Sequence, residues 1–212
     1  MKGTLAIFDL DRTFVRKNSS FSFYFYLLYR GVLPRSTLFS VLPIFVRYRL
    51  RKLSLKKLHA LVFRAILKGK SKALFLKGIE AFLDPFLKES LNPAVFSRFL
   101  EAKRKGSYTF LLSSSPDFLV EAIALRFGFD QWQGTEYAVD KEGFFCHISS
   151  LIEGTAKLKI AIEAAASFTT TVAYSDSEDD LPLLNWAKKA VVVKPDPKLK
   201  KQALLNAWEI IG

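Results

Sequence analysis

The stretch AIFDLDRTF (residues 6–14) runs three apolar residues into two acids, Asp9 and Asp11, that are one residue apart. The preceding run TLAIF (4–8) is short, apolar and typical of a buried parallel strand. Residues two apart in a strand point to the same side, so Asp9 and Asp11 would bring two like charges together. The pattern therefore indicates that a further charged group shares this strand end.

The composition is that of a folded globular chain. The chain has 212 residues, of which 50% are hydrophobic and 25% are charged, enough to bury a sizeable core. Cys146 is the single cysteine, so an internal disulfide is excluded, and His59 and His147 are too far apart to indicate a zinc site. The first residues reach acids too early for a signal peptide. We therefore expect a cytoplasmic protein.

The net charge of +12 is concentrated in one third of the chain. Residues 12–79 contain sixteen Lys and Arg and no Asp or Glu, whereas the rest contains sixteen basic and twenty acidic residues. Such asymmetry predicts an anionic partner: nucleic acid, a membrane surface or a phosphorylated substrate. Nucleic acid is the least favoured of the three, because the sequence holds no recognised nucleic-acid-binding motif.

Residues 16–90 are aromatic and basic, with helical spacing where the pattern is clearest. In SLKKLHALVFRAILKG, Ser54 is expected to cap a helix and Gly69 to end it. One apolar face is formed by Leu55, Leu58, Val62, Ala65 and Ile66. We interpret residues 16–90 as an inserted helical cap, and residues 1–15 and 91–212 as the core domain.

From Asn92 onward the pattern alternates between helix and strand. Asn92 and Gly106 are the expected ends of a helix, and strands are predicted at 108–112, 169–174 and 190–193. Other expected elements are a helix from Ser115, a hairpin turned at 141–143, helices from about Thr155 and near 179–188, and a last helix from about Asp196 that completes the chain. This alternation predicts an α/β fold with a parallel sheet and helices on both faces.

Polar residues follow the predicted strands at the places where ligands bind such sheets. Sites in open parallel sheets form outside the carboxyl ends of the strands. The three strand ends are followed by Asp9 and Asp11, by Ser113–Ser115, and by Ser175–Asp180. Lys157 lies near the start of the helix before the last of these strands. Four segments thus bring carboxylates, hydroxyls and an ammonium to one rim.

The charges at this rim favour a metal and a phosphate. Four acids, Asp9, Asp11, Asp176 and Asp180, would raise one another's pKa unless a cation were present. Mg²⁺ suits such oxygen ligands, because it is held by one or two carboxylates plus substrate phosphate. Lys157 would add positive charge for the same phosphate, and Ser113, at a helix start, could hydrogen-bond a phosphoryl oxygen.

In that setting the two opening acids take different roles. The Asp9 carboxylate can attack phosphorus and form an aspartyl-phosphate. The Asp11 carboxyl can protonate the leaving oxygen and later activate water.

These motifs resemble the haloacid dehalogenase-like (HAD) superfamily, in particular the subfamily IB hydrolases of its phosphoserine-phosphatase-like branch. The resemblance is carried in order by FDLDRT, LLSSS, Lys157 in EGTAKLKIA, and YSDSEDDLPLL. It implies a Rossmann-like core and a Mg²⁺-dependent phosphatase whose cap is inserted between the first and second motifs. It also implies site roles: catalysis by Asp9 and Asp11; phosphate binding by Ser113, Ser114 and Lys157; metal binding by Asp9, Asp176 and, through its carbonyl, Asp11; and support from Thr13, Ser177 and Asp180. Ser114 and Ser115 have the alternative reading of turn and helix-cap residues.

The substrate stays open at the sequence level. The basic cap favours an anionic phosphorylated metabolite. Phosphoserine phosphatases resemble the chain in layout but carry a cap-side Glu shortly after the first motif, and the comparable position here is near Asn18. A further alternative is a lipid phosphate, such as phosphatidylglycerophosphate.

Membrane contact is a separate alternative. The runs FSFYFYLLY (21–29) and LFSVLPIFV (38–46) are far shorter than the roughly 20 residues of a membrane span. They could dip into the interface on the inner face of the membrane, with basic residues on anionic lipid: Arg47, Arg49, Arg51, Lys52, Lys56 and Lys57. A non-catalytic membrane-binding protein is the reading outside the enzyme class.

Overall fold

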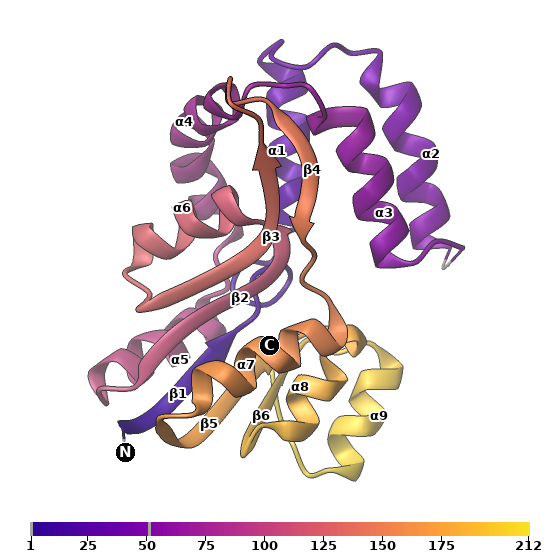
Figure 1. The fold of residues 1–212 in the computed structure, drawn as a ribbon. Coiled ribbons are helices and arrows are strands. Elements are labelled where there is room, and N and C mark those ends of the chain that lie inside the picture. The colour runs from indigo at the N-terminus through magenta and orange to yellow at the C-terminus, as the bar shows by residue number, and fades with distance from the viewer. Residues whose placement is uncertain (1, 51) are drawn as a thin grey trace.

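The computed structural model describes residues 2–50 and 52–212 (Figure 1). Arg51 and the side chain of Arg49, both expected at a lipid surface, lie outside the described part. The strands are β1 Lys2–Phe8, β2 Tyr108–Pro116, β3 Gln131–Val139, β4 Phe145–Ser150, β5 Phe168–Ser175, β6 Lys189–Val193 and β7 Glu209–Ile211. The helices are α1 Ser19–Tyr29, α2 Thr37–Arg49, α3 Leu55–Val62, the π-helical η1 Phe63–Leu67, α4 Lys72–Ser90, α5 Pro93–Arg104, α6 Asp117–Phe127, α7 Gly154–Ala165, the 3₁₀-helical η2 Glu178–Asp180, α8 Leu181–Trp186 and α9 Pro197–Leu205.

The predicted α/β fold is confirmed. The strands form one sheet in the order β4-β3-β2-β1-β5-β6-β7, and every neighbouring pair is parallel except β3 and β4. Alternate residues of the central strand face opposite layers, as strand geometry requires. Leu5 and Ile7 pack in the core that includes α7 to α9, whereas Ala6 and Phe8 pack in the core that includes α5 and α6. Helices therefore cover both faces of the sheet.

Several predicted boundaries agree with the structure and two differ. Asn92 caps α5 through a hydrogen bond from the backbone N–H of Ala94, and the hairpin turn at 141–143 joins β3 to β4. The strand predicted at 108–112 continues to Pro116, so α6 begins at Asp117 rather than at Ser115. The chain also adds β7 beyond the last helix, parallel to β6. A three-residue strand is too short to show a period in the sequence.

The segment between β1 and α5 is helical, as expected, with Ser54 as the N-cap of α3. Figure 1 shows α1 to α4 gathered beyond the carboxyl ends of the strands, beside the β3–β4 hairpin. Backbone hydrogen bonds join the two parts: the N–H of Gly69 donates to the carbonyl of Phe145, and the N–H of Phe145 donates to that of Lys70. The division at residues 16–90 stays a prediction, and the hairpin packs with the predicted cap.

Membrane spans are not found in the described part of the chain. None of the helices formed by residues 2–50 and 52–212 combines the length and the apolar character that a span needs.

Candidate active site

The carboxyl ends of three neighbouring strands bring the candidate residues together. Phe8, the last residue of β1, lies in register with Leu111 of β2 and Tyr174 of β5. Because these strands are parallel, the residues that follow each position emerge at the same edge of the sheet. Asp9 follows β1 directly, Ser113 to Ser115 lie near the carboxyl end of β2, and Asp176 follows β5. The arrangement of strand ends expected from the sequence is therefore present.

Lys157 forms the centre of a buried ion-pair cluster. It lies in the first turn of α7, and its Nζ atom is 2.6 Å from Asp9 Oδ1 and 2.8 Å from Asp180 Oδ2. The three side chains are 3%, 9% and 3% exposed for Lys157, Asp9 and Asp180. The hydroxyl of Ser175 donates a further hydrogen bond of 2.7 Å to Asp180 Oδ2. Burial of an ammonium at this position requires such partners.

The cluster holds more negative than positive charge. Burial raises the pKa of the Asp9 carboxyl, and nearby Asp180 and Asp176 add to the rise while Lys157 opposes it. Burial likewise raises the pKa of Asp176, with Arg12 opposing. For Lys157, burial alone would lower the pKa, but the two neighbouring carboxylates raise it above its ordinary value. The lysine is therefore a permanent cation among carboxyls that need more positive charge to stay ionised.

Arg12 and Thr13 bind the Asp176 loop to the Asp9 loop. Arg12 has a positive φ of 61°, and its Nε lies 3.4 Å from Asp176 Oδ2. Thr13 is fully buried; its hydroxyl donates to Asp176 Oδ1 at 3.3 Å and accepts from the backbone N–H of Asp176 at 3.0 Å. These contacts hold the two acidic loops at a fixed separation. Thr13 therefore contacts the Asp176 loop directly.

The donor set fits a hard divalent cation. Asp9 and Asp176 offer carboxylate oxygens at one edge of the sheet, close enough for the charge of Asp176 to raise the pKa of Asp9. No group of three or more His, Cys, Asp or Glu side chains with metal-ligating geometry occurs among the described residues. Mg²⁺ does not need such a group, because it keeps several waters and is held by one or two carboxylates. The excess of negative charge described above is the property that a bound cation would relieve.

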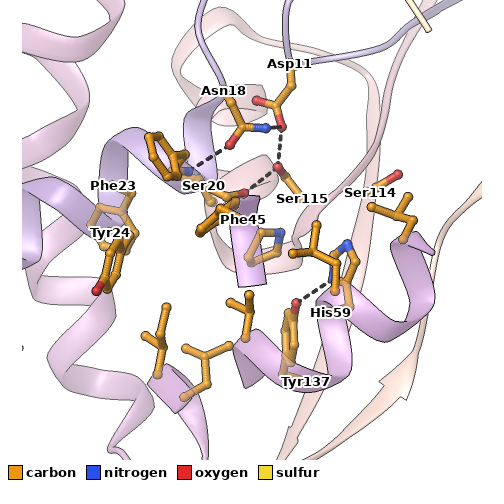
Figure 2. A pocket seen from close by; sticks show the side chains of 18 of the residues that line it. Asp11, Asn18, Ser20, Phe23, Tyr24, Phe45, His59, Ser114, Ser115 and Tyr137 are labelled. Atoms are coloured by element: carbon orange, nitrogen blue, oxygen red, sulfur yellow. Dashed lines mark hydrogen bonds between the residues drawn. The ribbon is translucent and has the colours of Figure 1, made fainter. Parts of the chain in front are cut away.

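Asp11 is held by the start of α1 and the end of β2. Its Oδ1 accepts from the backbone N–H of Ser19 at 2.7 Å. Its Oδ2 accepts from Asn18 Nδ2 at 3.1 Å and from the Ser115 hydroxyl at 2.6 Å, as Figure 2 shows. Ser20 extends the network, with its hydroxyl 2.6 Å from that of Ser115. The first turn of α1 thus fixes the orientation of the candidate acid/base group.

The serine run at the end of β2 divides into different roles. Ser113 is buried, and its hydroxyl accepts from the backbone N–H of Ser115. Ser114 lines the cavity beside Asp11, and its carbonyl accepts from the Thr135 hydroxyl. Ser115 does not cap α6, whose N-cap position is Pro116; its hydroxyl instead contacts Asp11. The alternative of Ser115 as a helix cap was therefore wrong.

Ser175 is the last residue of β5, and Ser177 lies in the loop that follows. The Ser177 hydroxyl accepts from the backbone N–H of Asp179 and caps η2. Ser175, which the sequence places at this strand end without a role, bonds Asp180 and so supports the partner of Lys157. Its position two residues before Ser177 in a predicted strand end was the available signal.

Two cavities meet at the site. An apolar cavity of about 450 Å³ extends from Asp11 and Ser115 under the helices α1 to α3. A more polar one of about 1010 Å³ opens beside Asp176 and Ser177. Arg12 lines both cavities. Asp11 therefore borders the apolar cavity, and Asp176 borders the more polar one.

Comparisons with known proteins agree with this geometry. The family model described as haloacid dehalogenase-like hydrolase matches residues 6–185. A histidinol-phosphatase of Neisseria meningitidis is 27% identical, with 98% of each chain covered. The phosphoserine phosphatase SerB1 of Mycobacterium tuberculosis is 26% identical over 97% of this chain and 69% of its own.

A solved structure shares the fold at still lower identity. A Bordetella pertussis protein, described as of unknown function, has a TM-score of 0.89 at 20% identity, and the match covers 100% of this chain and 99% of that one. The family model covers most of the chain, including the carboxyl ends of β1, β2 and β5. The chain therefore belongs to the haloacid dehalogenase-like hydrolases and is an enzyme of their phosphatase type.

Proposed function

We propose that the chain is a Mg²⁺-dependent phosphomonoester hydrolase that forms a phospho-aspartate on Asp9 and acts on an anionic phosphorylated metabolite. The observation that carries this proposal is the buried Asp9 carboxylate held 2.6 Å from Lys157 at the end of β1. A carboxylate fixed in this way, with an acid/base candidate two residues away, is arranged for covalent catalysis.

The proposed reaction has two displacements at phosphorus. In the first, a carboxylate oxygen of Asp9 bonds to phosphorus while the bond to the leaving alcohol breaks, and Asp11 donates its proton to the leaving oxygen. In the second, Asp11 takes a proton from water as that water bonds to phosphorus and the bond to Asp9 breaks. Inorganic phosphate leaves and Asp9 is restored. Proton transfer of this kind contributes roughly 10²–10⁴-fold to rate.

Other residues bind the phosphoryl group and the metal in this proposal. Ser113, Ser114 and Lys157 contact the phosphoryl oxygens. Asp9, Asp176 and the carbonyl of Asp11 would hold Mg²⁺, supported by Ser177 and Asp180. When bound, the ion supplies positive charge that offsets the carboxylates and the phosphoryl oxygens.

The test measures phosphate release from a small aryl phosphate with Mg²⁺. Asp9→Asn should lose activity by several orders of magnitude, because the nucleophile is gone. Asp179→Asn is the matched control, since Asp179 is an exposed acid near the same edge and should stay close to wild type. Removal of the metal with a chelator should abolish turnover, and added Mg²⁺ should restore it. Equal activity in the wild type and Asp9→Asn would reject the proposal and favour a non-catalytic protein.

The substrate panel follows from the relatives and from the cap. Phosphoserine and histidinol phosphate belong in it because relatives carry those names. Lipid phosphates belong in it as well. Both named substrates carry an ammonium, and residues 12–79 contain no acid to pair with one. The anionic or uncharged candidates are therefore the ones that the cap favours.

One surface favours action at an anionic membrane as a second candidate. Along α2 and at its end, Phe39, Leu42, Val46 and Leu50 recur at helical spacing and are 86%, 56%, 48% and 60% exposed. Such a stripe is unusual on a protein surface. Exposed basic residues lie close to it in the sequence: Arg30, Arg35, Arg47 and Lys52. An apolar stripe with basic neighbours suits the interface of an anionic bilayer.

Flotation with vesicles tests this second candidate. The wild type should float with anionic vesicles at low salt and less at high salt, because the basic residues supply part of the attraction. Phe39→Ser with Leu42→Ser should reduce flotation. Leu204→Ser with Leu205→Ser is the matched control, since those leucines of α9 are 67% and 70% exposed and lie in the predicted core domain, away from α2. No binding to anionic vesicles even at low salt would reject membrane contact.

A further inference from the structure

The apolar cavity beside Asp11 is large enough for a substrate group. Its volume of about 450 Å³ lies within the range of roughly 300–1,000 Å³ that small-molecule sites occupy. It begins at Asp11 and Ser115 and continues between α1 and α3 to Tyr137 of β3 (Figure 2). Its walls are mostly apolar, and include Phe21, Phe23, Leu27, Phe45, Leu58 and Val62.

The Asp11 and Asn18 side chains at one end of the cavity already have partners. Both carboxylate oxygens of Asp11 accept hydrogen bonds, from Ser19, Asn18 and Ser115. The Asn18 side chain donates to Asp11 and accepts from the backbone N–H of Phe21. A polar leaving group would therefore displace existing bonds rather than fill vacant ones.

Away from Asp11, the described lining includes the polar side chains of Tyr24, Tyr48, His59 and Tyr137. His59 Nδ1 and the Tyr137 hydroxyl are 3.2 Å apart (Figure 2). Burial lowers the pKa of His59 to about 4, so the ring is neutral near pH 7. Among the lining residues that the structure describes, Asp11 is the only acid and Arg12 the only Lys or Arg, and both lie at the reacting end. The interior therefore offers no counter-ion to an ammonium or to a second anionic group.

We propose that this cavity binds the leaving group of the substrate, and that this group is uncharged and apolar, such as an alkyl chain or an aromatic ring. The inference rests on the proposed hydrolysis at Asp9. Asp11 stands at the mouth, so a phosphoryl group at Asp9 places its leaving oxygen beside the acid and its carbon skeleton in the cavity. An apolar skeleton gains from leaving water, whereas a charged one loses its hydration without a partner.

A chain-length series tests the proposal on the wild-type enzyme. Phosphate release is measured for the soluble alkyl monophosphates from ethyl to octyl. Each added methylene should raise kcat/KM by about fourfold until the cavity is filled. Propyl phosphate and ethanolamine phosphate form a matched pair of similar size, in which a methyl group replaces an ammonium. Propyl phosphate should be preferred by roughly tenfold or more.

Failure of this inference is distinct from failure of the proposed function. A flat chain-length series, or a preference for ethanolamine phosphate, would overturn the inference even if turnover still depended on Asp9. Loss of that dependence on Asp9 would instead overturn the proposed function.

A cavity-filling variant tests whether the dependence on chain length arises in this cavity. Val62→Phe places a larger side chain in the α3 wall, and should lower the ratio of octyl to ethyl phosphate turnover. Val139→Phe makes the same replacement at a residue of β3 that is 40% exposed and outside the lining, and should keep the wild-type ratio. A wild-type ratio in folded Val62→Phe would overturn the assignment of this cavity. If Val62→Phe does not fold, the chain-length series and the matched pair still decide.

An apolar phosphate ester can be a soluble metabolite or a membrane lipid, and two substrates distinguish these sources. Octyl phosphate is used below its micelle concentration, and a single-chain lipid phosphate monoester is used in anionic vesicles. Hydrolysis of both assigns a lipid phosphate as the source. Hydrolysis of soluble octyl phosphate alone assigns a soluble apolar phosphate. Hydrolysis of neither, with ethyl phosphate still turned over, overturns the inference.

Discussion

Replacement of Lys157 by methionine removes the cation that separates two buried carboxylates. Its Nζ atom lies 2.6 Å from Asp9 and 2.8 Å from Asp180, and all three side chains are at most 9% exposed. Removal of one partner from a buried ion pair leaves uncompensated charge and costs about 3–5 kcal/mol. For a chain of this size that loss corresponds to a fall in Tm of about 6–20 °C. We expect Lys157→Met to show this loss of stability in metal-free buffer.

The assay is urea unfolding in the presence of a chelator, followed by circular dichroism. Lys159→Met is the matched control, because Lys159 is exposed on the same helix two residues away. Its effect on the free energy of unfolding should stay within about 0.5 kcal/mol. The double variant Lys157→Met with Asp180→Asn removes one of the two stranded charges, so it should be more stable than Lys157→Met alone.

Two stability results would contradict this role of Lys157. If Lys157→Met and Lys159→Met unfold at the same urea concentration, Lys157 does not neutralise the buried acids. A double variant that loses the sum of the two single effects would also contradict the coupling. Mg²⁺ gives an independent check: if Asp9 and Asp176 hold it, added Mg²⁺ should raise the stability of the wild type by mass action.

Three further predictions concern other parts of the site. Ser115→Ala should lower kcat for an alkyl phosphate more than for an aryl phosphate, because its 2.6 Å bond orients Asp11 and only a poor leaving group needs the acid; equal losses would contradict this. Burial lowers the pKa of His59 from 6.5 to about 4, so the unfolded chain takes up this proton more readily than the folded one. The free energy of unfolding therefore falls as the pH is lowered below about 6.5. Between pH 7 and pH 5, the free energy of unfolding measured with urea should fall by about 2 kcal/mol less in His59→Leu than in the wild type. Equal falls in the two proteins would count against the pKa shift. Gly134→Ala should reduce thermal stability and turnover, since a Cβ there would lie 2.7 Å from the Ser115 carbonyl, whereas Gly3→Ala meets nothing within 4 Å and should unfold like the wild type.

The sheet and its strand ends could be predicted because their signals are local. Apolar runs that stop at Asp9, Ser113 and Asp176 mark the carboxyl ends of parallel strands, and parallel strands deliver those ends to one edge. The helix boundaries at Asn92 and Ser54 were predictable for the same reason, since each cap lies beside the turn that it stabilises. The residues that meet at this edge could therefore be predicted before the order of the strands was known.

The partners of Asp11 could not be predicted in the same way. Ser115 precedes Pro116, which is typical of a helix start, so its side chain was expected to cap a helix. The extension of β2 to Pro116 turns that hydroxyl toward Asp11, which is 104 residues away in sequence. The cavity is similarly non-local, because its walls come from α1, α3 and β3. Periodicity identifies an apolar face but does not show that the facing elements leave a space between them.

Asp11 connects the chemistry of the core to the cavity beneath the helices. Its carboxylate is held by the first turn of α1 on one side and by Ser115 of β2 on the other. The same turn of α1 supplies Ser20 and Phe21 to the cavity lining. A leaving group that fills the cavity therefore contacts the helix start that orients the acid/base group, while a leaving group that leaves the cavity empty does not. For that reason an apolar leaving group should raise kcat as well as lower KM, which distinguishes a site that positions Asp11 from one that only adds binding energy.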